Sequence, residues 1–251
     1  MNLKSICVIG AGHLGHSLAN QLVKLGHKVK ATYRSHKKSN ALYESIKFSL
    51  GDKFNSANLQ AEIFIINVPP SQTDEHSLQN LRDHFKDSLF IYVSSTSVFN
   101  EDQLLVSEDT LAAPKSERSL RAYKQESVFK NDCIIRCSGL ISDTRHPINS
   151  LIKKENTGAN HPLNLIHIKD VINIISIVID KEQFKSLIHA THINNLTKGE
   201  YYKKYAQTHQ LGEIIYTNSP SKGKKVISNT LKDWSYQFIA PISSVDTVPD
   251  D

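Results

Sequence analysis

Three glycines near the start of the sequence are the residues whose type and spacing point most directly to chemistry. Gly10, Gly12 and Gly15 follow an apolar run and open a segment in which leucines recur at helical spacing. In a strand, turn and helix of this kind, the first glycine permits the tight turn, the second lets a pyrophosphate approach the backbone, and the third lets the helix pack on the strand. The unpaired N–H groups at the helix N-terminus favour an anion.

This spacing predicts a dinucleotide site in a Rossmann strand, turn and helix. The predicted contacts from the turn and the start of the helix are Gly10, Gly12, His13, Leu14 and Gly15. The alternative interpretation is a glycine turn that maintains the fold and binds no dinucleotide.

The residues after the second apolar run, 28–33, predict which dinucleotide binds. In a Rossmann unit, an acidic residue roughly 20 positions beyond the glycines binds the ribose 2′-OH of NAD, whereas an arginine accommodates the 2′-phosphate of NADP. Here Arg34 and Ser35 occupy this place, Lys37 and Lys38 follow, and the strand end carries no acid. The sequence therefore favours NADP(H) over NAD(H), although a solvated basic loop would show the same composition.

Another apolar run, residues 62–66, ends in Asn67, Val68 and Pro69. A continuous apolar run suits a parallel strand that is covered on both faces. We expect these three residues at the carboxyl edge of the sheet, beside the dinucleotide.

The alternation of apolar runs and helical patterns predicts an α/β fold, a doubly wound parallel Rossmann sheet with a small C-terminal substrate lobe. Within a single unit of residues 1–251, we expect a dinucleotide-binding core over 1–141 and a mixed part over 142–242 that adds the last strand and the lobe. Residues 243–251 are expected to form a disordered acidic tail. A weak helix is predicted over 40–46, a short strand over 48–50, helices over 74–86 and 116–130, one strand over 133–140, and a helix or a strand over 170–179.

Composition limits the function classes. The chain of 251 residues has 30 Lys and Arg against 25 Asp and Glu, spread along the sequence, so we expect no nucleic-acid-binding face. We expect no membrane span and no signal peptide, which makes the cytoplasm the default location. The three cysteines show no metal-type spacing, and no metal site is predicted.

Four motifs together resemble one known family. They are GAGHLG at 10–15, FIYVSSTSVF at 90–99, CIIRCSGLIS at 133–142 and NLIHIKDVINII at 164–175. In this order they resemble the extended and atypical short-chain dehydrogenase/reductases, which include NAD(P)-dependent nucleotide-sugar epimerases, dehydratases and reductases. The resemblance implies that Ser95 orients the reacting oxygen, and that Thr96 and Arg145 contact the substrate.

The catalytic helix departs from the family pattern. The family carries a YxxxK pair there, in which the lysine lowers the tyrosine pKa and holds the nicotinamide ribose. Tyr123 is the only tyrosine of this segment, and Ser127 stands where the lysine is expected. An alignment on Glu126 instead places Arg118 and Ala122 at the two positions. Tyr123 is the predicted proton carrier, without an intact YxxxK.

The leading hypothesis is therefore a cytoplasmic NADP(H)-dependent oxidoreductase or epimerase/dehydratase-like enzyme with a small hydroxylated or nucleotide-linked substrate, a nucleotide sugar among the candidates. The degenerate YxxxK keeps open a second hypothesis, a non-catalytic NADP(H) sensor. A β-hydroxyacid-dehydrogenase-like protein is a third, although the chain lacks the long helical domain of those enzymes. By family analogy, a homodimer would pair the helices at 75–86 and 116–130.

Overall fold

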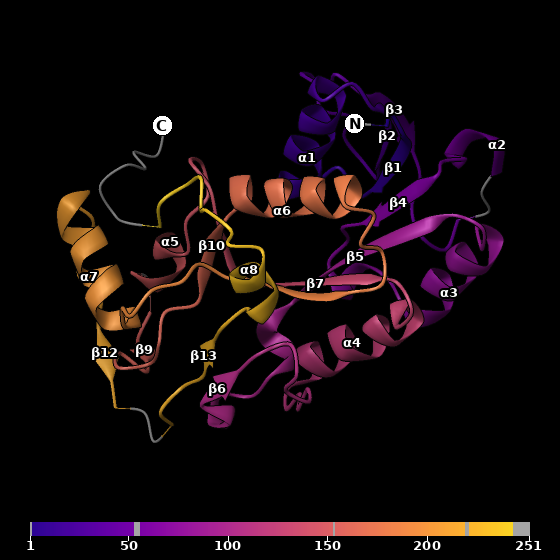
Figure 1. Ribbon diagram of the computed structural model, residues 1–251. Coiled ribbons are helices and arrows are strands. Elements are labelled where there is room, and N and C mark those ends of the chain that lie inside the picture. The colour runs from indigo at the N-terminus through magenta and orange to yellow at the C-terminus, as the bar shows by residue number, and fades with distance from the viewer. Residues whose placement is uncertain (1, 53–55, 153, 219–220, 243–251) are drawn as a thin grey trace. The chain divides into compact units, whose positions relative to one another are not determined.

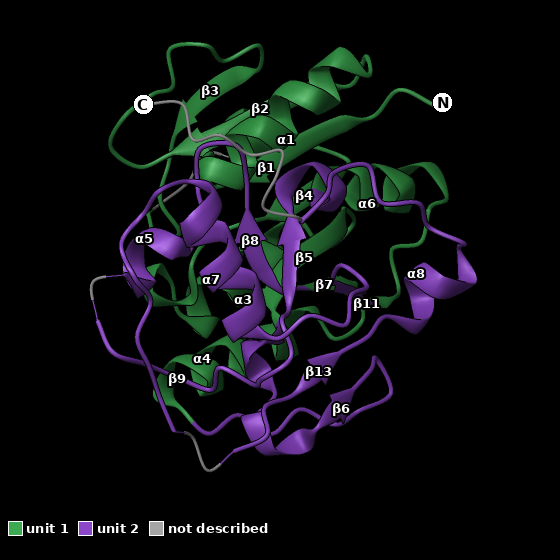
Figure 2. Ribbon diagram, turned by 90° about the vertical axis from the view of Figure 1, so that its left-hand side faces the viewer, with its two compact units in different colours: residues 1–95, 116–136, 172–187 green, residues 96–115, 137–171, 188–251 purple. Residues whose placement is uncertain are grey.

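The computed structural model describes residues 2–52, 56–152, 154–218 and 221–242. The tail predicted at 243–251 lies outside these described residues. The chain divides into two compact units that interleave in sequence, shown in green and purple in Figure 2. The first unit contains residues 1–95, 116–136 and 172–187, and the second contains 96–115, 137–171 and 188–251. The expected division at residue 141 stays a prediction.

A seven-stranded parallel sheet forms the centre of the fold, with the strand order β11-β7-β5-β4-β1-β2-β3 (Figure 1). Its strands are β1 (Ser5–Ile9), β2 (Lys28–Tyr33), β3 (Glu44–Lys47), β4 (Ile63–Ile66), β5 (Leu89–Ser95), β7 (Cys133–Cys137) and β11 (Leu187–Ala190). The order reverses between β1 and β4, as in a doubly wound sheet. The predicted Rossmann architecture is confirmed.

Helices cover both faces of this sheet. On one face lie α1 (His13–Lys24) and α6 (Ile168–Asp180), and on the other α3 (Glu75–His84) and α4 (Glu117–Glu126) (Figure 1). The short α2 (Ser56–Leu59) precedes β4, and 3-10 turns occupy Pro70–Gln72, Thr96–Val98, Glu101–Gln103 and Ser127–Phe129. Coverage on both faces explains why β4 is buried at every position, as its unbroken apolar run predicts.

Aromatic side chains fill the core beneath α3 and α4. Phe64 stacks on Phe90 at a ring distance of 5.3 Å, and Tyr92 stacks on Phe129 at 4.8 Å. Such offset stacking adds to the stabilisation that burial of the apolar area provides.

The second unit has short paired strands and a separate core. Its strands pair as β8 (Gly139–Ile141) with β10 (Leu165–His167), β9 (Asn156–Thr157) with β12 (Tyr216–Thr217), and β6 (Leu105–Val106) with β13 (Lys225–Val226). Its helices are α5 (Ile148–Leu151), α7 (Lys198–Thr208) and α8 (Asn229–Asp233). The α7 helix supplies Tyr201, Tyr202 and Tyr205 to the core of this unit.

The structure corrects several element predictions. Residues 40–46 form no helix: their last three residues begin β3, so the third strand precedes the predicted 48–50. The strand expected over 133–140 is divided into β7 and β8: the N–H of Ser138 still donates to the Ala190 carbonyl oxygen of β11, and from Gly139 the chain pairs with β10 instead. The apolar segment 170–179 is helix α6 and not a strand.

Candidate functional site

The glycine turn is held by two side chains from neighbouring strands. Gly10 has a φ of +102°, which favours glycine, and its N–H donates to Thr32 Oγ1 at 2.9 Å. Asn67 Nδ2 donates to the Gly10 carbonyl oxygen at 3.2 Å. The turn is thus fixed from β2 on one side and from the end of β4 on the other.

The three glycines differ in what surrounds their α-carbons. A Cβ on Gly10 would overlap the Asn67 carbonyl oxygen, and a Cβ on Gly15 would overlap the Gly10 carbonyl oxygen. A Cβ on Gly12 would have no protein atom within 4 Å. Gly10 and Gly15 therefore serve the protein's own packing, whereas the space at Gly12 fits a group from outside the chain, as the predicted approach of a pyrophosphate requires.

A cleft of about 280 Å³ opens at this turn within the first unit. Of the predicted cofactor residues, the structure brings together on its wall Gly10, Gly12, Arg34, Ser35, Asn67, Val68 and Pro69. Leu14 instead is a buried core residue of α1, Gly15 packs the helix on the turn, and His13 begins α1 outside the wall.

Sequence reasoning missed other parts of the cleft wall, which are Thr32, Tyr33, His36, Phe48, Ser49, Leu50 and Gln72. Thr32 and Tyr33 end β2, and the others lie in the segments that follow β2, β3 and β4. The rule that parallel strands present their carboxyl ends to a ligand could have identified those after β2 and β4. It could not identify Phe48 and Ser49, because the sequence predicts the third strand at 48–50 and so places these two residues within the strand and not after it.

The basic segment after β2 is anchored to the first helix. His16 Nδ1 lies 2.9 Å from the hydroxyl of Tyr43, and Asn20 Oδ1 accepts from the N–H of Leu42 at 2.9 Å. Burial, with a smaller contribution from Lys38, lowers the pKa of His16. These contacts fix the far end of the loop that begins at Arg34.

A buried glutamine holds the opposite wall of the cleft. Gln125 on α4 has no exposed surface, and its amide nitrogen donates to the carbonyl oxygens of Pro70 at 3.1 Å and Thr73 at 2.9 Å. The hydroxyl of Tyr92 donates to its Oε1 at 3.1 Å. Gln125 therefore ties the turn after Pro69 to β5.

Ser95 ends β5 at the same carboxyl edge of the sheet as Asn67, because β4 and β5 are parallel neighbours in register from Ile63 and Leu89. Its neighbour Ser94 donates to Glu126 Oε1 at 2.6 Å, and Arg136 binds Glu126 through Nε and Nη2 at 3.0 and 2.7 Å. All three partners are buried. This network fixes the strand end that presents Ser95.

Tyr123 is not part of the glycine-turn cleft. Its side chain is 42% exposed and lines a separate cavity of about 790 Å³. We call this cavity the α4 groove; its lining residues lie within 123–136 and 185–187. The α4 helix, which the structure describes throughout, buries Ser119, Ala122, Gln125 and Glu126, so neither a tyrosine nor a lysine is on its inner face. A catalytic role for Tyr123 stays a prediction to which this placement gives no support.

The two predicted substrate residues lie in the second unit. Thr96 begins the 3-10 turn after β5 and is buried. Arg145 is exposed, in a turn closed by paired backbone hydrogen bonds between Ser142 and Arg145. Their substrate roles stay predictions.

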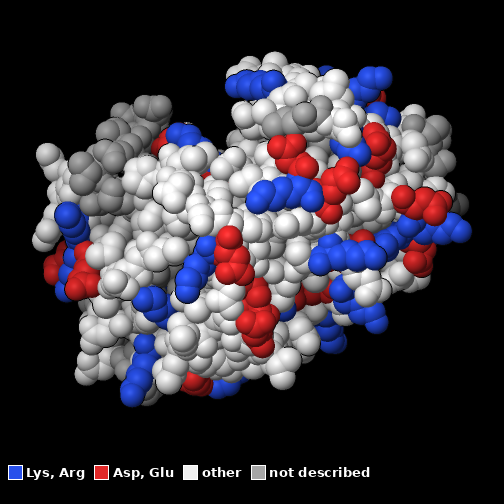
Figure 3. All heavy atoms as spheres, viewed as in Figure 1, with Lys and Arg blue, Asp and Glu red and all other residues white. Residues whose placement is uncertain are grey.

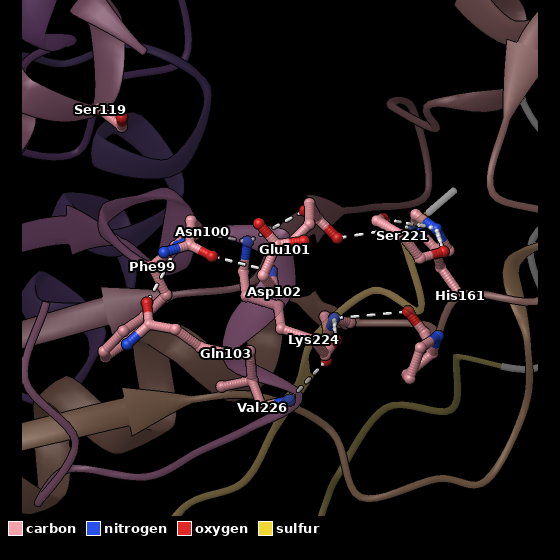
Figure 4. Close-up of polar contacts among 12 residues, drawn as sticks. Phe99, Asn100, Glu101, Asp102, Gln103, Ser119, His161, Ser221, Lys224 and Val226 are labelled. Atoms are coloured by element: carbon pink, nitrogen blue, oxygen red, sulfur yellow. Dashed lines mark hydrogen bonds and ion pairs between the residues drawn. The ribbon is translucent and has the colours of Figure 1, made fainter. Parts of the chain in front are cut away.

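A second cluster of ionisable groups lies within the second unit. Lys224 Nζ donates to the Phe99 carbonyl oxygen at 2.9 Å and to Glu101 Oε1 at 3.0 Å, while His161 Nδ1 lies 3.5 Å from Glu101 Oε2 (Figure 4). Lys224 and His161 are buried. Because Lys224 donates to two acceptors from the 99–103 turn, we interpret the cluster as a structural tie between this turn and β13.

No group of three or more His, Cys, Asp or Glu side chains in the described part of the chain could hold a metal ion. Likewise, no helix among the described residues is long and apolar enough to cross a membrane. On the face shown in Figure 3, positive and negative side chains are interspersed.

The seven-stranded parallel sheet and its glycine-turn cleft define the Rossmann fold of the NAD-dependent epimerase/dehydratases and short-chain dehydrogenase/reductases. The resemblance of the sequence to this group is thus confirmed at the level of the fold. The family model described as "NADP oxidoreductase coenzyme F420-dependent" matches residues 5–96, the part that carries the glycine turn.

Three similar proteins cover nearly the whole chain. Protein YeeZ of Escherichia coli strain K12 is 24% identical over 96% of this chain and 98% of its own length. The structure of a protein assigned as an NAD-dependent epimerase/dehydratase from Methylobacillus flagellatus is 22% identical and superposes with a TM-score of 0.79, over 96% of this chain and 94% of that one. MoeE5, solved with UDP-glucuronic acid and NAD, is 16% identical with a TM-score of 0.76, over 91% of both chains.

Proposed function

We propose that the chain binds a nicotinamide dinucleotide in the glycine-turn cleft and prefers NADP(H). The observation that carries this proposal is the open space at Gly12, where the chain leaves room beside the N-terminus of α1. Arg34 and Ser35 line the same cleft and supply donors for a 2′-phosphate, and this segment of the strand end contains no acid to bind a 2′-OH.

We propose further that the protein is an oxidoreductase or an epimerase/dehydratase-like enzyme. A bound nicotinamide supplies hydride transfer. Ser95, held at the end of β5 by the Ser94–Glu126–Arg136 network, would hydrogen-bond the reacting oxygen of the substrate. The complex of MoeE5 with a UDP sugar supports a small hydroxylated or nucleotide-linked substrate, for which Thr96 and Arg145 are the candidate contacts.

The inner face of α4 favours a second candidate function. Because Ser119, Ala122, Gln125 and Glu126 occupy that face, no side chain there supplies the proton transfer of a YxxxK pair. A protein that binds NADP(H) and signals its level to a partner needs the cleft and no proton carrier.

Calorimetric titration with NADPH, NADP⁺ and NADH tests the cofactor proposal. Arg34→Ala should remove the preference for NADPH over NADH, whereas Lys24→Ala, a change of equal charge at the exposed far end of α1, should keep it. Absence of binding by all three dinucleotides would refute the proposal. If NADPH binds, net oxidation of NADPH with candidate carbonyl substrates indicates an oxidoreductase, and conversion of a candidate nucleotide sugar without net oxidation indicates an epimerase or dehydratase. Binding without either activity supports the sensor.

The remaining proposals are a cytoplasmic location and a homodimer through α3 and α4. Light scattering during size-exclusion chromatography measures the molar mass and so tests the homodimer. A monomer at all concentrations would contradict it.

A further inference from the structure

The α4 groove is larger than the glycine-turn cleft and shares no residue with it. Its volume of about 790 Å³ lies within the range of about 300–1,000 Å³ that small-molecule sites usually have. All of its wall belongs to the first unit. A groove of this size is therefore available for a ligand while the cleft at Gly12 is occupied.

Unbalanced positive charge surrounds the groove. Lys124, Lys130 and Lys185 line it, and among the described residues none of the three forms a salt bridge. Three exposed ammonium groups around one cavity attract an anion.

The two acids of the groove are already neutralised from within the fold. Glu126 is engaged by Arg136, and Asp132 accepts from Arg82 Nε at 2.9 Å and from Arg82 Nη2 at 3.2 Å. Lys124 and Lys130 form no salt bridge with either acid, whereas the charge of Lys185 also acts on Asp132, where it opposes the rise in the Asp132 pKa that burial causes.

The groove also offers apolar contacts. Ile134 and Leu187, at the starts of β7 and β11, contribute to its wall, and the exposed Tyr123 lines the same groove. An aromatic ring that is partly exposed beside aliphatic side chains suits a planar ligand body.

We propose that the α4 groove is a second binding site, distinct from the dinucleotide cleft, for a small phosphorylated molecule with an aromatic or apolar body. The lysines bind the phosphate groups, and Tyr123 and Ile134 contact the body. Since Glu126 reaches from the groove to Ser94, an occupant would lie one side chain away from the strand end at Ser95.

The test is calorimetric titration with pyrophosphate and with phenyl phosphate, each in the presence of saturating NADPH. Lys130→Gln/Lys185→Gln should weaken both by about tenfold or more, because the variant removes two positive charges that would pair with the phosphate groups. The control Lys203→Gln/Lys204→Gln changes the net charge equally on the exposed face of α7 and should have little effect. Tyr123→Ala should weaken phenyl phosphate and leave pyrophosphate unchanged.

If both double lysine variants weaken binding equally, the effect is one of net charge and the proposal is overturned. Absence of pyrophosphate and phenyl phosphate binding to the wild type would overturn it as well. These outcomes are independent of the cofactor proposal. If NADPH does not bind, the same titrations without it still locate or exclude the site through the paired variants.

Discussion

Gly10 and Gly15 lie so close together that a methyl group on Gly15 would overlap the carbonyl oxygen of Gly10. The start of α1 thus packs directly on the turn that precedes it. Gly12, between them, has no such neighbour. The same motif therefore contains one glycine for a ligand and two for the fold, and the two roles can be separated by substitution.

Gly12→Ala should weaken dinucleotide binding by about tenfold or more, since the methyl group occupies the space left for the pyrophosphate. Its free energy of unfolding should change little or rise by about 0.4–1 kcal/mol, because alanine restricts the unfolded chain. Gly15→Ala should lower the free energy of unfolding by about 1–3 kcal/mol through the overlap. Urea unfolding measures the stability of each variant, and titration with NADPH measures its dinucleotide binding. Similar loss of stability in the two variants would contradict the division of roles.

The glycine spacing and the apolar runs predict the parallel sheet and seven residues of the cleft wall, because both depend on local sequence. A strand end and a glycine turn are read from adjacent residues, which is why the sequence alone predicts that Asn67 and Arg34 both adjoin the dinucleotide, and the two line one cleft. Contacts between distant segments carry no such signal. Neither the anchoring of Pro70 by Gln125 nor the exposure of Tyr123 follows from spacing, since both depend on how α4 rotates against β5.

Gln125→Leu should weaken NADPH binding as well as the fold. The change keeps the side-chain size but removes the donor to the half-buried Pro70 and Thr73 carbonyl oxygens, at a cost of about 0.5–1.5 kcal/mol for each lost hydrogen bond. The turn they belong to adjoins the cleft wall at Pro69 and Gln72. Tyr92→Phe is the matched control, because it removes one hydrogen bond to Gln125 and keeps both donors to the turn. If Gln125→Leu unfolds more easily yet binds NADPH as tightly as the wild type, Gln125 supports the core alone.

The Glu126–Arg136 pair should show strong coupling. Arg136→Met leaves a buried carboxylate without its cation and should lower the free energy of unfolding by about 3–5 kcal/mol. Glu126→Gln/Arg136→Met removes the negative charge of Glu126 together with its cationic partner. This double variant should therefore recover part of the lost free energy of unfolding. A double-mutant cycle by urea unfolding measures the coupling. Additive effects of the two substitutions would show that the pair does not act as a unit.

Acid should destabilise the second unit through His146. Its Nδ1 accepts from the N–H of Ile148 at 3.2 Å, its Nε2 lies 3.0 Å from the Tyr201 hydroxyl, and its ring stacks on Tyr205 at 3.8 Å. A backbone N–H can only donate, so Nδ1 has no room for a proton. Burial, with a smaller contribution from His209, lowers the pKa of His146 from 6.5 to about 4.

The sign of the effect follows from the proton uptake of the two states. Below pH 6.5 the unfolded chain protonates His146, whereas the folded chain keeps it neutral until about pH 4, so the unfolded state binds more protons and stability falls as the pH falls through this window. His146→Phe keeps an aromatic ring against Tyr205 and cannot titrate. Its melting temperature should therefore fall less steeply between pH 6.5 and 4 than that of the wild type, even if the variant is less stable at pH 7. Exposed His76→Phe serves as the control, and parallel pH profiles for wild type and His146→Phe would disprove the assignment.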